Sequence, residues 1–179
     1  MLASHGCRSI CGYSLSLASL NTLPQGARLA LPSLNRATLS MLAHQSGAAV
    51  FTACFRNAGA VAAYIEQHSA RVLLVAGERW PDGTLRPARE DEWGAGAVIA
   101  ALYMLASPEA QAAADAYLAV QANLLASVMK CRSGRELMEC GFADDFDWPC
   151  DLNVSQVVPL LSYPAYLDAD RHRPPILPV

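Results

Sequence analysis

Short apolar runs alternate with helical segments from residue 28 onward, and this alternation constrains the fold more than any other feature of the chain. The runs expected to form strands are residues 28–31, 48–54, 71–76 and 154–161. The segments expected to form helices are residues 37–45, 57–67, 92–105, 108–128 and 135–140. Alternation of this kind predicts an α/β fold, namely a three-layer α/β/α sandwich around a mostly parallel sheet.

Local signals support several helix boundaries. Ser107 followed by Pro108 is typical of an N-cap and the first helical position. Ser133 and Glu136 have the spacing of a capping box, and Gly141 is a natural helix stop. The chain has 179 residues, 53% of them hydrophobic, and it contains no repeat or linker, so we expect one domain over residues 1–179.

Composition excludes several classes of function. A net charge of −3 provides no broad basic surface, so no nucleic-acid partner is expected. No apolar run approaches the length of a bilayer span, and residues 1–19 lack the features of a signal peptide, so we expect a cytoplasmic protein without a membrane partner. The six cysteines match no close-paired zinc pattern, which leaves a zinc or redox protein as the least supported reading. Cys54, at the end of a predicted strand, is expected in the core.

The segment 77–92 has eight charged residues in sixteen positions, directly after a predicted strand. In open α/β sheets, ligands bind at loops that follow the carboxyl ends of strands. Carboxylates there suit Mg²⁺, and arginines suit the oxygens of an anionic substrate. We therefore expect Glu78 and Asp91 to bind metal or orient water, with Glu90 beside them. Arg86 is expected to be an exposed loop residue that binds the anion rather than stabilising the fold.

Each of these groups also has a purely structural reading. Glu90 and Asp91 precede a helix, where carboxylates favour the positive end of the helix dipole, so capping is the alternative for that pair. An acidic turn at Asp144, Asp145 and Asp147 is equally consistent with a solvated loop and with a site.

Two turns at predicted strand ends are candidate anion-binding segments. In the first, Ser33, Asn35 and Thr38 open a helix, so their side chains and backbone amides suit an anion. In the second, Asn57 occupies the equivalent position after the next strand. Ordinary helix capping is the alternative for both turns.

Several short motifs then resemble, in order, those of the 2-phosphosulfolactate phosphatase family. They are Ser33-Leu34-Asn35-Arg36-Ala37-Thr38-Leu39-Ser40, Arg56-Asn57-Ala58-Gly59-Ala60-Val61-Ala62, Ala76-Gly77-Glu78-Arg79-Trp80, Leu85-Arg86-Pro87, Glu90-Asp91, Gly94-Ala95-Gly96-Ala97, Ser133-Gly134-Arg135-Glu136-Leu137 and Gly141-Phe142. The resemblance covers roughly residues 13 to 162.

The resemblance implies an α/β/α sandwich and Mg²⁺-dependent hydrolysis of a phosphate monoester on a small sulfonated hydroxy acid, a step in coenzyme M synthesis in some archaea. By resemblance, Asn35, Thr38 and Asn57 lie on the substrate side, where Ser33 of the same turn is also expected, and Glu78, Glu90 and Asp91 are expected as metal ligands. From their chemistry we expect Glu78 or Asp91 to position the attacking water and Arg86 to stabilise charge in the transition state, which makes Glu78, Asp91 and Arg86 the expected catalytic residues.

Two departures from the family pattern affect the expected activity. Arg36 replaces the glycine of the usual Asn-Gly-Ala-Thr turn, and no Asp-x-x-Arg-Ala-Thr segment precedes Leu29. The chain is therefore expected to be an amino-terminally shortened member, oligomeric or poorly soluble, because a sheet that lacks a strand exposes unpaired backbone. The leading function is a Mg²⁺-dependent phosphatase with a small anionic phosphorylated substrate. The alternative is a non-catalytic remnant that binds anions or a partner.

Overall fold

The computed structural model describes residues 20–24, 26–30, 34–68, 71–80, 82–142, 145–146 and 148–171, with only the backbone described for residues 34–36. Its helices are α2 (Leu34–Gln45), α3 (Ala58–His68), α4 (Arg89–Ala101), α5 (Pro108–Val120), the 3₁₀ turn η1 (Gln121–Asn123), α6 (Leu124–Lys130) and α7 (Arg132–Glu139). Its strands are β1 (Glu78–Arg79), β2 (Leu85–Arg86), β3 (Pro159–Ser162) and β4 (Ala165–Asp168). The fold is thus a mixture of helix and strand, as the sequence predicts at this coarse level.

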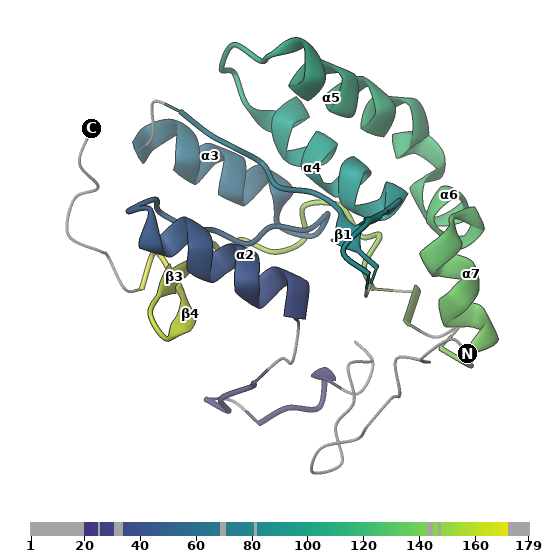
Figure 1. The fold of residues 1–179 in the computed structure, drawn as a ribbon, viewed down its shortest axis with the longest axis horizontal. Helices are drawn as coiled ribbons and strands as arrows, with labels where there is room; N and C mark the ends of the chain where they lie inside the picture. The colour runs from purple at the N-terminus through teal and green to yellow at the C-terminus, as the bar shows by residue number, and fades with distance from the viewer. Residues whose placement is uncertain are drawn as a thin grey trace.

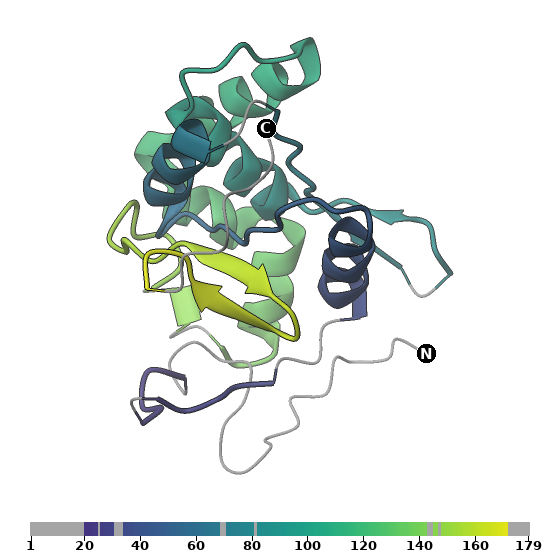
Figure 2. The same ribbon diagram turned by 90° about the vertical axis from the view of Figure 1, so that its left-hand side faces the viewer.

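The strands of the described residues form two separate antiparallel hairpins, visible apart from each other in Figures 1 and 2. β1 pairs with β2, so that Glu78 lies opposite Arg86, and β3 pairs with β4. One isolated antiparallel bridge joins Phe51 to Leu160. The mostly parallel sheet and the three-layer sandwich are therefore not confirmed by these pairings.

Three of the predicted strands do not form strands in the structure. Residues 28–30, 48–54 and 71–77 are not strands, apart from the bridge at Phe51, and residue 31 lies outside the described residues. The side chains of segment 71–76 alternate instead: Val72 and Leu74 pack against the core, whereas Leu73 and Val75 are exposed, although a strand of a sheet covered on both faces would bury all four. An alternating sequence pattern determines which side chains face the core. A β-strand also needs a second backbone segment with which it can form hydrogen bonds. The predicted strand 154–161 is β only from Pro159.

The helices follow the sequence more closely. α2 and α3 include the predicted segments, and α4 begins at Arg89, slightly earlier than expected. Ser107 caps α5 by accepting a hydrogen bond from the Ala110 backbone amide at 3.3 Å, with Pro108 at the first helical position. The predicted capping box at Ser133 is wrong, because Cys131 is the N-cap of α7. Gly141, with φ of 84°, ends that segment as expected.

Two apolar clusters form the core. The larger one joins α3, α4, α5 and α6 through buried residues that include Phe55, Ala62, Val98, Tyr117 and Leu124. The smaller one packs α3 against β3 through Val61, Ile65, Val158, Leu160 and Ala169. Figure 1 shows α5 lying beside α4 at the top of the view, with α3 on the other side of α4.

One helical stretch qualifies the expectation that no segment could span a bilayer. Residues Pro108–Lys130, which combine α5, η1 and α6, are long and apolar enough to do so by length and composition alone. Core helices of soluble proteins meet the same criterion but are mostly buried, whereas 22% of the apolar window of this stretch is buried inside the protein. A single stretch of this kind is weak evidence for a membrane span.

The closest approach of α4 and α5 depends on Gly96. A β-carbon at this position would lie 2.2 Å from the Ala113 carbonyl oxygen and 2.8 Å from the Tyr117 β-carbon. We predict that Gly96→Ala lowers the free energy of unfolding by about 1–3 kcal/mol, because α5 must move outward. Chemical denaturation measured by circular dichroism checks this value.

The matched control is Gly94→Ala in the same helix, where an added β-carbon meets nothing within 4 Å. Since alanine favours helix over glycine, this variant should be as stable as the parent or more stable by about 0.5–1 kcal/mol. Equal stability of the Gly96 and Gly94 variants would contradict the described α4–α5 contact.

Candidate functional site

The guanidinium of Arg86 lies at the centre of the densest cluster of charged side chains in the described residues. Its side chain is only 13% exposed and forms ion pairs with Glu78 and Glu136. The hairpin register places Glu78 directly opposite Arg86, since β1 and β2 are antiparallel, and their ion pair spans the two strands. The bond from Arg86 Nη2 to Glu136 Oε2 is 2.5 Å long and joins this hairpin to α7. The expectation that Arg86 is an exposed loop residue is therefore wrong.

Trp80 and Arg132 complete this cluster. The Cζ atoms of Arg86 and Arg132 lie 5.2 and 4.7 Å from the centre of the Trp80 ring. Arg132 Nε also donates a hydrogen bond of 3.0 Å to Glu136 Oε1. Cations over an indole face are attracted by its electron-rich centre, so Trp80 supports both guanidiniums. We call Glu78, Trp80, Arg86, Arg132 and Glu136 the Arg86 cluster.

The first turn of α4 contains three further carboxylates, those of Glu90, Asp91 and Glu92. The half-buried Glu90 accepts a hydrogen bond from the Cys131 thiol, with 3.5 Å between Sγ and Oε2. Arg89 and Glu92 form an exposed pair with each other. Asp91 is half-buried and interacts with other groups of the protein.

The thiol of Cys131 is protonated at neutral pH. Burial raises its pKa, and the negative charge of Glu90 acts in the same direction, although the backbone amides of Gly134 and Ser133 oppose them. A protonated thiol is a hydrogen-bond donor rather than a nucleophile, and Cys131 also donates to the Val128 carbonyl at 2.9 Å. Burial likewise raises the pKa of Cys150. Cys54 is exposed, so the prediction that it belongs to the core is wrong.

Asn57 is buried, and its side chain bonds within the protein. Its Oδ1 accepts from the Cys54 backbone amide at 2.8 Å, and its Nδ2 donates to the Val157 carbonyl at 3.0 Å. Asn153 occupies the amino-terminal end of α3 by accepting a hydrogen bond from the Gly59 amide at 2.8 Å. The Asn57 side chain therefore does not cap α3, since its amide bonds to backbone groups outside the helix, and Asn153 accepts from the first turn of α3 instead.

The other predicted residues are only partly described. Ser33 and the side chain of Asn35 lie outside the described residues, as do Asp144 and Asp147. Thr38 lies on an exposed part of α2 and has interactions of its own. Asp145 is buried. Among the described residues, the structure thus brings Glu78 and Arg86 together, whereas the Asn57 side chain has its contacts with Cys54 and Val157.

Three members of the Arg86 cluster were not predicted as site residues: Trp80, Arg132 and Glu136. A signal for two of them exists, since Arg132 and Glu136 have the i, i+4 spacing of a helical ion pair. Nothing local indicates that Glu136 reaches Arg86, which is 50 positions away in the sequence.

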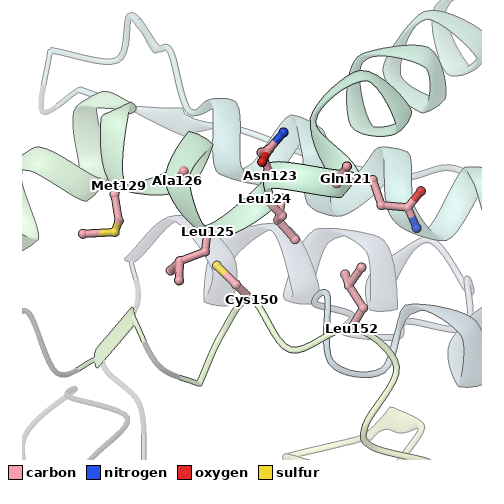
Figure 3. Close-up of a pocket in the computed structure, with 9 residues that line it drawn as sticks. Gln121, Asn123, Leu124, Leu125, Ala126, Met129, Cys150 and Leu152 are labelled. Carbon is pink, nitrogen blue, oxygen red and sulfur yellow. The ribbon is translucent and has the colours of Figure 1, made fainter.

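A hollow of about 450 Å³ lies elsewhere, between η1 and α6 on one side and the segment that carries Cys150 and Leu152 on the other (Figure 3). Its nine lining residues include no charged side chain. An anionic substrate needs cations, so this hollow does not suit one.

A magnesium ion needs only one or two carboxylates when water and phosphate oxygens supply its remaining ligands. Within the described part of the chain, no group of three or more His, Cys, Asp and Glu side chains is placed so that it could hold a metal ion. Any one or two of the carboxylates of Glu78, Glu90 and Asp91 could supply the few protein ligands that magnesium needs. The three together do not form a complete coordination shell.

We predict that Arg86→Ala destabilises the protein by about 1–3 kcal/mol, because it leaves Glu78 and Glu136 without their shared cation. The control Arg89→Ala removes an arginine in the first turn of α4 whose side chain is 64% exposed, and it should change stability by less than about 0.5 kcal/mol. Urea unfolding curves for both variants measure the difference. An Arg86 variant as stable as the Arg89 variant would show that the cluster does not stabilise the fold.

Comparison with known families gives one match. The family model described as 2-phosphosulpholactate phosphatase matches residues 6–164. Because the match covers far more than half of the 179 residues, the chain belongs to this family, and the resemblance seen in the motifs is confirmed. No curated protein matched the chain.

Proposed function

We propose that this member of the 2-phosphosulfolactate phosphatase family is a Mg²⁺-dependent hydrolase of the phosphate monoester of a small sulfonated hydroxy acid. The products would be sulfolactate, or a closely similar acid, and inorganic phosphate. The observation that carries the proposal is the family match over residues 6–164, since the family is one of phosphatases. The Arg86 cluster supports it, because it places guanidiniums beside carboxylates on the loop where the family motifs occur.

Roles for individual residues follow from their chemistry. Arg86 would stabilise the negative charge that develops on the phosphate oxygens, and its ion pairs with Glu78 and Glu136 fix its position. Asp91 or Glu78 would orient the attacking water as a general base. Ser33, Asn35, Thr38 and Asn57 remain our proposed substrate-side residues.

We propose Glu78, Glu90 and Asp91 as the residues that hold Mg²⁺. When bound, the ion supplies neutralisation of phosphate charge and a lower pKa for a coordinated water. Carboxylate oxygens are preferred magnesium ligands, and one or two of these residues would suffice when water and phosphate oxygens supply the remaining ligands.

We also propose the finer form of the fold, a three-layer α/β/α sandwich with a mostly parallel sheet. Support comes from segment 71–76, whose side chains alternate between core and solvent, and from the antiparallel bridge at Phe51. The inward-facing Phe51, Val72 and Leu74 pack against the core clusters, as residues of a central sheet do.

A non-catalytic, anion-binding or partner-binding role is the second candidate. It is favoured by one observation: both Nη groups of Arg86 already bond to protein carboxylates. A protein without turnover could retain such a cluster for stability alone.

Phosphate release from a generic monoester and from a 2-phosphosulfolactate-type substrate separates the two functions. We predict release with Mg²⁺, loss of release with a chelator and recovery when Mg²⁺ or Mn²⁺ is added back. Asp91→Asn should lower kcat by about 10²-fold or more, because a carboxylate that orients water or metal is lost. The control Asp115→Asn alters an exposed carboxylate on α5 and should leave kcat unchanged. Chelator-resistant turnover contradicts the metal, and no turnover under any condition supports the second candidate.

We propose that the protein is a cytoplasmic homo-oligomer with no nucleic-acid or membrane partner. Leu73 and Val75 are 87% and 63% exposed on segment 71–77, which suits association between copies. Leu73→Lys should shift the mass measured by light scattering towards the monomer. The control Leu105→Lys, at a fully exposed leucine of the α4–α5 loop, should not. A monomeric parent protein contradicts the proposal.

A further inference from the structure

Glu136 occupies the space between two arginines in the way that a bound anion does. Its Oε2 accepts a hydrogen bond from Arg86 at 2.5 Å, and its Oε1 accepts one from Arg132 at 3.0 Å. Each carboxylate oxygen therefore has its own guanidinium. Both guanidiniums lie over the Trp80 ring, which holds them at one place although they come from different elements, β2 and α7.

Two guanidiniums that converge on an aromatic face are a general receptor for an oxyanion. Their planar N–H groups match the oxygens of a carboxylate, sulfonate or phosphate, and each such bond is strengthened by charge. Glu136 supplies a carboxylate to this receptor from within the protein. A ligand oxyanion of the same kind would need the same donors, so the two must compete.

The members of the cluster differ in how firmly they are held. Arg86 is 13% exposed and is also held by Glu78, whereas the Glu136 side chain is 46% exposed. The Nε atom of Arg86 is buried and has no hydrogen-bond partner among the described residues. The Nε–H group is therefore a hydrogen-bond donor that the protein does not use. Glu136 is the more exposed of the two carboxylate partners of Arg86, so it is the member that can turn into solvent when another anion takes its place, while Glu78 holds Arg86.

We propose that Glu136 is an internal competitor that occupies the Arg86–Arg132 receptor until a sulfonate or phosphate oxyanion replaces it. Identifying that oxyanion as a group of the substrate rests on the proposed function, but the competition itself does not. In this arrangement Glu136 lowers the affinity for weakly bound anions and keeps the two arginines neutralised in the free protein.

Binding of methanesulfonate and of inorganic phosphate tests the proposal without turnover. Both anions are titrated against chloride at constant ionic strength, with tryptophan fluorescence or calorimetry as the readout. Glu136→Gln removes the competing charge and should bind the anions about fivefold more tightly than the parent. Arg132→Gln removes half of the receptor and should bind them at least about fivefold more weakly. The two anions show whether the receptor prefers the sulfonate or the phosphate.

Glu139→Gln is the matched control, because it removes one exposed carboxylate from the same helix and forms no ion pair within the described residues. It should leave both affinities unchanged. Glu136→Asp keeps the charge on a shorter side chain that cannot reach both arginines, and its affinity should fall between those of the parent and Glu136→Gln. Thermal unfolding confirms that each variant is folded.

Unchanged or weaker anion binding by Glu136→Gln, with Glu136→Asp also no tighter than the parent, would overturn the proposal. That result would make Glu136 a purely structural partner of Arg86. A protein that lacks phosphatase activity but gains anion affinity in Glu136→Gln would contradict the proposed function and leave the competition intact.

Discussion

The arrangement of charge in this protein depends on the guanidinium of Arg86, which is held between Glu78 and Glu136. A guanidinium that is mostly removed from water is unfavourable unless carboxylates and hydrogen bonds replace the lost hydration. Glu78 does this across the β1–β2 hairpin, and Glu136 does it from α7. Because Arg86 needs both carboxylates, the β1–β2 hairpin and α7 must lie next to each other. The family motifs around Glu78 and Arg86 are thereby held against α7.

The position of α7 depends in turn on close helix packing. A β-carbon at Gly134 would lie 2.0 Å from the Val128 carbonyl oxygen, so α6 and α7 can fold back on each other only with glycine at this position. The same kind of contact at Gly96 fixes α5 against α4. Small residues therefore set the distances between helices, and these distances place Arg132 and Glu136 within reach of the hairpin.

Sequence patterns predicted the features that depend on neighbouring residues. Caps and stops such as Ser107, Pro108 and Gly141 were correct because each acts on the backbone within one turn. The apolar run 71–76 was predicted as a strand, but it forms no ladder and its Leu73 and Val75 side chains are exposed, since strand pairing and burial depend on a distant backbone. The N-cap of α7 was misplaced because Ser133 satisfies the capping pattern although Cys131 begins the helix.

In the candidate site, too, features set by neighbouring residues were predicted and features set by distant contacts were not. Glu78 and Arg86 were predicted together from their place in a charged loop, and a hairpin register that no local motif specifies makes them partners. Glu136 and Arg132 were missed as site residues, because their contacts with Arg86 and Trp80 cross the fold.

The central claim is that Arg86 and Glu136 interact across the fold. A double-mutant cycle with Arg86→Gln and Glu136→Gln tests it most directly, with urea unfolding as the measurement. The account predicts a coupling free energy of at least about 0.5 kcal/mol, and strictly additive effects of the two substitutions would contradict it.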